Sequence, residues 1–344
     1  MTTNIYKVAI VGASTLAGKE LSETLGESAF AASDFVLLDA DDAVGKLESV
    51  ADDVTFVRKL EAASFEGADF VFFAGDPEEA RTHWKSAQQA GASVVDMTFA
   101  LEATPNVPVR APWVAELLGN AGSQPDLKTP AVVAAHPAAV LLATVLAQLN
   151  VRHKVKSASA TVLEPASQYG RAAMDELHQQ TVALLSFQPL PKDVYDAQAA
   201  FNITPAMGAE TKVKLAETEQ RIRRHFRALA GNALPVPALQ LAHAASFHGT
   251  IASVLVELET AATEEQVSVA LDGEHVDVLL DESDPPSNLS VAGQQNIQVR
   301  VRVEPDSSTR YWLWIAADNL KLAALNAIAC GAELARLRPQ GKVQ

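Results

Sequence analysis

The chain has 344 residues, of which 48% are hydrophobic and 20% charged, so it is long enough for a sizeable core and two domains are expected. Its 42 acidic and 27 basic residues give a formal net charge of −15, a sign that disfavours nucleic acid and anionic membranes as partners. A single cysteine, Cys330, excludes an internal disulfide and a cysteine zinc cluster, and we expect no metal site.

The N-terminal stretch lacks the basic and apolar pattern of a secretory signal. The apolar run at 139–149 is about half as long as a membrane span. We therefore expect a cytoplasmic protein.

The first part of the chain alternates between apolar runs and helical patterns. This alternation predicts right-handed βαβ units and a doubly wound parallel sheet, an α/β architecture. The expected strands lie at 5–11, 35–40, 68–75 and 92–97, and the expected helices at 13–25 and 77–90.

The pattern changes near residue 130. A short strand at 131–135 precedes a helix at 138–149, and the segments 155–163 and 296–305 alternate as strands with one solvent face. Further helices are expected at 174–186 and 211–229, further strands around 239–259, and a polar loop at 281–295. The second part is therefore α+β. The helix at 318–337 has small and apolar residues on nearly all sides, so it is expected to be buried between the domains.

A glycine turn follows the first strand and opens the first helix, which is the setting of a dinucleotide-binding turn. Thr15 occupies the middle glycine position, where its Cβ is expected to crowd a pyrophosphate. A strand-helix turn without a ligand is the alternative. The candidate cofactor-binding residues here are Gly12, Ala13, Ser14, Thr15, Leu16 and Gly18.

Asp39 ends the second strand, where an acid commonly accepts a hydrogen bond from the ribose 2′-hydroxyl of NAD. Asp41 and Asp42 follow, and three carboxylates would repel the 2′-phosphate of NADP. NAD is therefore expected in preference to NADP. A solvated acidic turn, with no nucleotide bound, remains open.

Several longer segments together resemble the aspartate-semialdehyde dehydrogenase family, in the family's order along nearly the whole chain. They are GASTLAGKE at 12–20, AVGK at 43–46, SQYGRAAMDELHQQT at 167–181, FNITP at 201–205 and DNLKLAALNA at 318–327. The resemblance implies an N-terminal Rossmann domain, a C-terminal α+β domain that forms a homodimer, and a last helix that returns to the first domain. It implies NADP-dependent conversion of an acyl phosphate to an aldehyde, and it adds Ser167, Asn319 and Asn326 to the cofactor-binding candidates.

On this basis we expect a first domain at 1–130 together with the helix 318–338, and a second domain at 131–317. The small-molecule partner is a nucleotide, if one binds.

The active-site motif departs from the family. The family's Asn-Pro-Asn-Cys turn reads His136-Pro137-Ala138-Ala139 here, so Ala139 stands at the nucleophile position. The family reaction needs a thiolate to form a hemithioacetal and a thioester, and a methyl group can do neither. Cys330 lies in the expected buried last helix, where a small core residue is its ordinary role.

The substrate positions depart as well. Glu164 stands at the family's glutamine, Leu241 and Leu101 at its two arginines, and leucines cannot pair with phosphate or carboxylate. His248 keeps the acid-base position as a vestigial base, and Lys214 matches the phosphate lysine less securely. The remaining exchanges put His243 at a proline, Phe247 at a glycine and Ser167-Gln168-Tyr169-Gly170 at a Ser-Gly-Ala-Gly loop.

These losses resemble the Usg-1-like branch of the family, which lacks the cysteine and keeps the scaffold. The sequence therefore predicts a protein that is inactive in the thiol-dependent phosphorylating reaction. Two alternatives stay open. One is an NAD-dependent oxidoreductase with non-covalent chemistry through His248 or His136, and the other is an NAD(H)-binding interaction module.

Overall fold

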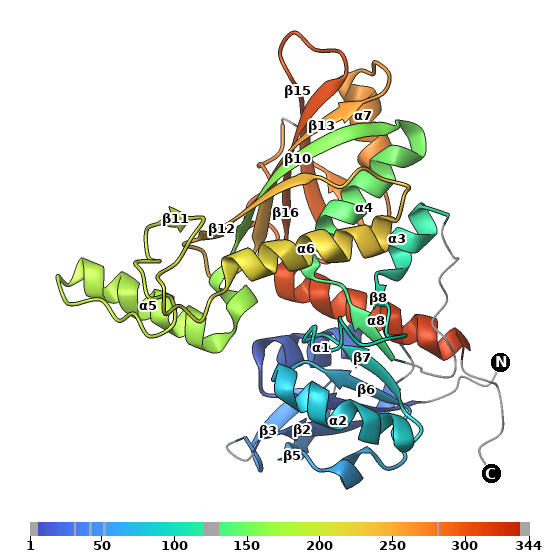
Figure 1. The fold of residues 1–344 in the computed structure, drawn as a ribbon, viewed down its shortest axis with the longest axis vertical. Coiled ribbons are helices and arrows are strands. Elements are labelled where there is room, and N and C mark those ends of the chain that lie inside the picture. Colours follow the sequence, from blue (N-terminus) through green and yellow to red (C-terminus); the bar gives the residue numbers. More distant parts are fainter. Residues whose placement is uncertain are drawn as a thin grey trace. The chain divides into compact units, whose positions relative to one another are not determined.

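A computed structural model describes residues 6–30, 32–40, 43–50, 53–119, 131–280 and 282–337 (Figure 1). The chain divides into two compact units. Unit 1 comprises the described residues of Met1–Glu116, Asn120–His136 and Ala323–Gln344, and unit 2 those of Leu117–Gly119 and Pro137–Leu322. The units thus divide at His136 and at Leu322, where the sequence predicted boundaries after 130 and after 317.

Unit 1 is built on a seven-stranded sheet in the order β5-β2-β1-β6-β7-β9-β8, in which every pairing is parallel. This confirms the predicted doubly wound sheet. The strands are β1 (Tyr6–Val11), β2 (Ala32–Asp39), β5 (Arg58–Lys59), β6 (Phe70–Phe73), β7 (Ser93–Asp96), β8 (Val109–Arg110) and β9 (Ala131–Ala134). The strand expected at 131–135 is β9 of this sheet rather than part of the second domain, because its apolar run pairs with β7.

The helices of unit 1 pack on the sheet because successive strand residues point to opposite faces. Val8 and Ile10 of β1 enter one core, and Ala9 and Val11 enter the other. The connecting elements are α1 (Leu16–Glu27), η1 (Ala62–Phe65), α2 (Pro77–Gln89) and α3 (Pro112–Leu117), with a separate hairpin of β3 (Leu47–Val50) and β4 (Asp53–Phe56).

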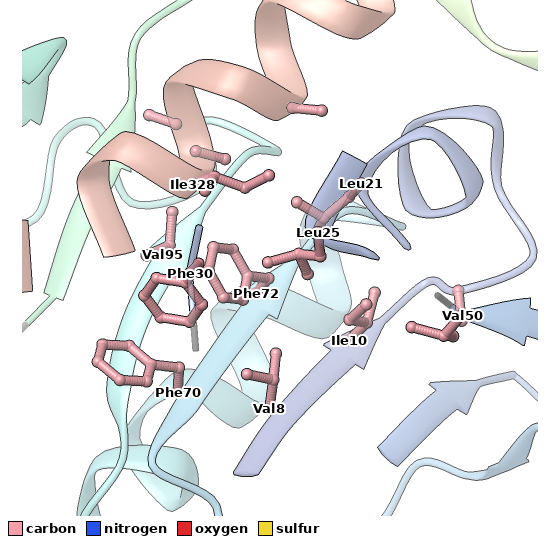
Figure 2. Close-up of a cluster of buried hydrophobic side chains, with 14 of the residues drawn as sticks. Val8, Ile10, Leu21, Leu25, Phe30, Val50, Phe70, Phe72, Val95 and Ile328 are labelled. Atoms are coloured by element: carbon pink, nitrogen blue, oxygen red, sulfur yellow. The ribbon is translucent and has the colours of Figure 1, made fainter. Parts of the chain in front are cut away.

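The first of these cores contains the part of α8 (Asn319–Leu337) that belongs to unit 1. Figure 2 shows Phe30, Phe70 and Phe72 gathered beneath Ile328 of this helix, beside Leu25 of α1. Full burial of a phenylalanine stabilises a fold by roughly 2–3 kcal/mol. The C-terminal helix is therefore an integral part of the first unit's core.

Unit 2 is built on a second seven-stranded sheet, of mixed direction, in the order β11-β12-β10-β13-β16-β15-β14. The pairs β10/β12 and β14/β15 are parallel and the others antiparallel. The strands are β10 (Val155–Glu164), β11 (Ile203–Thr204), β12 (Ala238–Ala244), β13 (Thr250–Leu258), β14 (Val276–Val278), β15 (Ile297–Val303) and β16 (Arg310–Ala317). The α+β character predicted for this part is confirmed.

The helices of unit 2 are α4 (Pro137–Arg152), η2 (Ala166–Tyr169), α5 (Arg171–Leu185), α6 (Leu215–Ala230) and α7 (Glu264–Leu271). Helix α4 starts with Pro137, whose fixed φ suits the first helical position, and it is apolar all round and almost wholly buried. Helix α4 packs between α6 and α7, all three helices contact the sheet, and α5 extends away from it (Figure 1). No helix in the described part of the chain is long and apolar enough to cross a membrane.

Candidate functional site

The glycine turn of unit 1 requires its two glycines for packing. Gly12 has a φ of +80°, and a Cβ there would lie 2.2 Å from Cα of Gly75. A Cβ on Gly18 would lie 2.1 Å from the carbonyl oxygen of Gly12. Only glycine allows this turn to approach the end of β6 and the start of α1 so closely, as the first and third glycines of a dinucleotide turn do.

Thr15 is the N-cap residue of α1. Its hydroxyl oxygen accepts a hydrogen bond from the backbone N–H of Gly18 at 3.0 Å and lies 2.8 Å from the carbonyl oxygen of Gly12. The residue expected to crowd a pyrophosphate thus stabilises the start of the helix. Ala13 is buried in the core, and Leu16 is the first helical residue, where unpaired N–H groups give the helix its positive end.

Asp39 fastens the glycine turn to the end of β2. One carboxylate oxygen, Oδ2, accepts from the backbone N–H of Ser14 at 2.8 Å and from the Ser14 hydroxyl, and Oδ1 accepts from the N–H of Ala40 at 2.9 Å. A carboxylate oxygen has two acceptor positions, so Oδ1 retains one for a ribose hydroxyl. The further predicted carboxylates, Asp41 and Asp42, lie outside the described residues.

Asn326 is the member of the predicted cofactor set that lies on α8 in unit 1. Its side-chain N–H donates to the carbonyl oxygen of Arg110 at 3.1 Å, and its buried Oδ1 has no hydrogen-bond partner among the described residues. An orphaned amide oxygen is an acceptor that a bound ligand could use.

Cys330 lies one turn further along α8. It is fully buried, its thiol lies 3.7 Å from the carbonyl oxygen of Arg110, and burial raises the pKa of the thiol well above its ordinary value. The group is therefore a neutral core thiol and not an activated nucleophile.

The predicted nucleophile position lies at the first turn of α4. Ala139 is fully buried, and its methyl group offers no lone pair. His136 precedes this helix and is also buried, with its ring centroid 5.3 Å from that of Phe99. In the described part of the chain, no group of His, Cys, Asp and Glu side chains could hold a metal ion.

His248 lies in a loop that Asn319 holds in place. The amide oxygen of Asn319 accepts from the N–H of Gly249 at 3.2 Å, and its amide nitrogen donates to the Ser167 hydroxyl at 3.1 Å. The N–H of Ser167 donates in turn to the carbonyl oxygen of Phe247 at 2.9 Å. Two predicted cofactor-binding residues, Ser167 and Asn319, thus bind each other beside the half-buried His248.

Glu164, at the predicted glutamine position, is fully buried at the end of β10. It accepts a 2.5 Å hydrogen bond from the hydroxyl of Tyr169, and burial raises its pKa to about 7. Leu241, at the predicted arginine position, is buried on the neighbouring strand, and Lys214 is exposed before α6.

The structure adds three residues to this group that the sequence did not predict as partners. They are Tyr169, Tyr195 and His243. The His243 ring centroid lies 4.9 Å from that of Tyr195 and 6.2 Å from that of Tyr169, and His243 pairs in register with Glu164. The available signal was a polar residue near the end of each of two largely apolar strands, the glutamate of TVLE and the histidine of LQLAHA.

Two family profiles match the chain. The profile described as semialdehyde dehydrogenase, NAD binding domain, matches residues 7–120, and the one described as semialdehyde dehydrogenase, dimerisation domain, matches residues 146–322. Between them they cover most of both units.

Similar proteins and structures point the same way. A USG-1 protein homolog of Pseudomonas aeruginosa is 32% identical over 94% of this chain and 96% of that protein, and an aspartate-semialdehyde dehydrogenase of Rickettsia bellii is 25% identical over 96% and 98%. A probable aspartate-semialdehyde dehydrogenase from Pseudomonas aeruginosa has a similar structure, with a TM-score of 0.85, 27% identity and coverage of 97% of this chain and 99% of that one.

Proposed function

Because the chain belongs to the semialdehyde dehydrogenase family, we propose that it keeps the family's nucleotide-binding scaffold and is inactive in the thiol-dependent phosphorylating reaction. One observation carries the proposal: the first turn of α4 presents a buried Ala139 where the family's nucleophile stands. Thiol catalysis forms and breaks a carbon-sulfur bond, so the loss of sulfur removes the reaction path. Cys330 cannot substitute, since it is buried, neutral and part of the core of unit 1.

The positions that would bind anions support the same proposal. Leu101 and Leu241 are 1% and 2% exposed and pack as core side chains. Arginine at such positions supplies paired N–H donors to phosphate or carboxylate, and leucine supplies none. The position predicted for the glutamine holds a carboxyl group engaged by Tyr169. Covalent catalysis and anion binding are therefore both missing.

The assay is phosphate-dependent oxidation of aspartate semialdehyde, followed by NADPH absorbance, with an active aspartate-semialdehyde dehydrogenase as positive control. We expect no turnover by the purified protein, and none by Ala139→Cys, because anion binding is still absent. Phosphate-dependent turnover by the unmodified protein, free of host enzyme, would refute the proposal. Turnover of aldehydes with NAD but without phosphate would instead favour non-covalent oxidoreductase chemistry.

For the nucleotide, we propose NAD in preference to NADP. The tight strand-to-helix turn that Gly12 and Gly18 allow, the open acceptor position on Asp39 and the orphaned Oδ1 of Asn326 fit a dinucleotide. The Asp39 carboxylate repels a 2′-phosphate and can accept from a ribose hydroxyl. When bound, the nicotinamide would supply hydride chemistry, and the residues of this chain would hold and orient it.

Titration calorimetry with NAD and NADP tests the preference. Asp39→Asn should reduce the difference between the affinities for NAD and NADP. Asp34→Asn, which changes an exposed carboxylate on the same strand, should leave this difference unchanged. Tighter binding of NADP than of NAD would refute the charge argument. Binding of neither by the wild type, restored in Thr15→Gly, would assign the loss to Thr15.

We also propose that the protein forms a homodimer through unit 2. The sheet face opposite α4 and α6 is open, and Ser253, Arg300, Trp312 and Trp314 line a hollow of about 250 Å³ on it. An exposed sheet face carrying tryptophans is typical of a surface that a partner covers. Sedimentation should show a species of twice 36.5 kDa, and Ser253→Lys should shift it to the monomer. A monomer alone in the wild type at micromolar concentration would contradict this.

A further inference from the structure

A buried polar layer in unit 2 contains Glu164, whose position is used above only as a sign of lost chemistry, and His243, which the proposed function does not use. Glu164 of β10 and His243 of β12 are register partners on parallel strands, so their side chains lie on the same face of the sheet. Both residues are fully buried. The positions that precede them on the same face are apolar, Val162 and Leu241. The two polar side chains therefore share one site in an otherwise apolar layer.

The imidazole of His243 is the unusual member of this layer. Neither ring nitrogen has a hydrogen-bond partner among the residues that the structure describes, and both are shielded from solvent. Burial lowers the pKa of the ring to about 4, so it is neutral at physiological pH, with one N–H donor and one nitrogen acceptor. A buried polar group without partners is costly, and native proteins usually place water or a ligand against it.

Tyr169 covers this site. Its hydroxyl donates to Glu164, its ring lies against that of His243, and the residue remains partly exposed although Glu164 and His243 are buried. The other side of the imidazole is closed by Tyr195, which is fully buried and whose hydroxyl donates to the carbonyl oxygen of Ala173 at 2.9 Å. Tyr169 is therefore a partly exposed side chain that contacts both members of the buried polar site.

The backbone on both sides of Tyr169 is held by hydrogen bonds, including one from the N–H of Gly170 to the carbonyl oxygen of Ser167 at 3.2 Å, so a gate here has to move by rotation of the side chain. The start of η2 is fixed by hydrogen bonds from Ala166 and Ser167 to the loop 246–247, both at 2.9 Å. Gly170 follows Tyr169 with a φ of +84°, and no neighbouring atom lies within 4 Å of where its Cβ would be. Rotation of the Tyr169 side chain has to break the hydrogen bond of its hydroxyl to Glu164. The next residue, Gly170, has no side chain that would block this rotation, and the space beside it is open.

We propose that Glu164 and His243 form an occluded binding site for a small uncharged molecule that both donates and accepts hydrogen bonds, and that Tyr169 is its gate. A donor and an acceptor are what a neutral imidazole needs, and a net charge is disfavoured because the surrounding layer is apolar. Rotation of Tyr169 exposes Glu164 and His243, and an occupant then satisfies the ring nitrogens. The site lies within unit 2 and does not depend on nucleotide binding in unit 1.

Access to His243 tests the gate. Diethyl pyrocarbonate acylates exposed imidazole nitrogens, and mass spectrometry of the full-length protein reads each histidine separately. Tyr169→Phe removes one hydrogen-bonding hydroxyl and keeps the ring, so His243 modification should rise by up to about tenfold, and it should rise further in Tyr169→Ala. His225, buried in α6 of the same unit, is the matched control and should not change.

Two results would overturn the gate. One is a parallel rise at His225, which would mean that the whole unit loosens. The other is unchanged modification of His243 in Tyr169→Ala when circular dichroism shows the variant folded. If that variant does not fold, Tyr169→Phe decides alone, and an unchanged His243 rate there refutes the gate.

Ligand binding tests the site. Tyr169→Ala should be stabilised by phenol, which restores both the ring and the hydroxyl that Glu164 accepts from, and much less by toluene, which has the same shape without the hydroxyl. A second change, Glu164→Leu, should abolish the preference for phenol. Equal stabilisation by the two probes would show an apolar cavity only, and no stabilisation by either would show that no site exists; each refutes the proposal.

Discussion

The pH dependence of unit 2 stability should depend on two buried groups that act in opposite directions. Burial raises the pKa of Glu164 from 4.5 to about 7 and lowers that of His243 from 6.5 to about 4. The folded chain keeps a proton on Glu164 that the unfolded chain loses above pH 4.5, so this residue lowers stability as the pH rises from 4.5 to 7. The unfolded chain holds a proton on His243 that the folded chain excludes, so this residue lowers stability as the pH falls from 6.5 to 4.

Between pH 4.5 and 6.5 the two effects cancel, because folding takes up a proton on Glu164 and releases one from His243. Each contributes a slope of about 1.4 kcal/mol per pH unit, so each amounts to about 3 kcal/mol across its own window. The neighbouring Tyr169 and Tyr195 have raised pKa values and stay protonated throughout this range. The free energy of unfolding of the wild type should therefore change little between pH 4.5 and 6.5, although each of the two groups alone would change it by several kcal/mol.

Single substitutions should reveal them. The difference in free energy of unfolding between Glu164→Gln and wild type should shift in favour of the variant by about 3 kcal/mol as the pH rises from 4.5 to 7. The corresponding difference for His243→Leu should shift in favour of that variant by about 3 kcal/mol as the pH falls from 6.5 to 4. For the double variant, the difference in free energy of unfolding from wild type should not change with pH between 4.5 and 6.5, where the two windows overlap.

Urea unfolding at steps of half a pH unit measures this. In a background of Trp84→Phe and Trp113→Phe, the remaining tryptophans, Trp312 and Trp314, lie in unit 2 and report on that unit alone. A Glu164→Gln curve that runs parallel to wild type between pH 4.5 and 7 would refute the reasoning, since it would mean that the carboxyl has its ordinary pKa in the folded protein.

Three further changes test other parts of the fold. Thr15→Ala should lower the free energy of unfolding by about 1 kcal/mol in chemical denaturation, because it removes the cap of α1, and an unchanged value would contradict that role. Gly12→Ala should cost at least about 3 kcal/mol, seen as a lower melting temperature or loss of folded protein, because its Cβ meets Gly75 and its φ is positive. Glu333→Ala leaves the buried Arg110 without its partly buried ion-pair partner and should cost about 2–3 kcal/mol in urea unfolding. Asp175→Ala, in an exposed pair, should cost less than about 1 kcal/mol, and equal costs would show that burial does not matter here.

The parallel sheet of unit 1 could be predicted from the sequence because each of its longer strands is a continuous apolar run between turns. The elements that were not predicted are short or lie beside stronger patterns. The two-residue strands Arg58–Lys59 and Val109–Arg110 contain no full period, and the eight-residue strand Arg310–Ala317 has apolar residues on both faces. Pairing with neighbours, which is a tertiary contact, decides such segments.

Some features of the candidate site could likewise be predicted from the sequence, and others could not. Local motifs indicate the glycine turn and the alanine at the start of α4, because each lies at a fixed offset from a strand or helix boundary. The hydrogen bond from Tyr169 to Glu164 and the packing of Tyr195 on His243 depend on strand register and on the course of the loop 186–202. No local pattern carries that information.

The exchanges in unit 2 are not independent of one another. Ala139 and Leu241 fill core positions with apolar groups, and the hydroxyl of Tyr169 donates to one carboxyl oxygen of Glu164. Arginine in place of a leucine that is 2% exposed would bury a charge, and glutamine in place of Glu164 would change the partner that the Tyr169 hydroxyl meets. The reversal of Leu241 to arginine therefore destabilises the present core before it contributes any chemistry. A cysteine restored at position 139 alone would therefore lie in a unit whose packing and hydrogen bonds leave no arginine at position 241 to bind an anionic substrate.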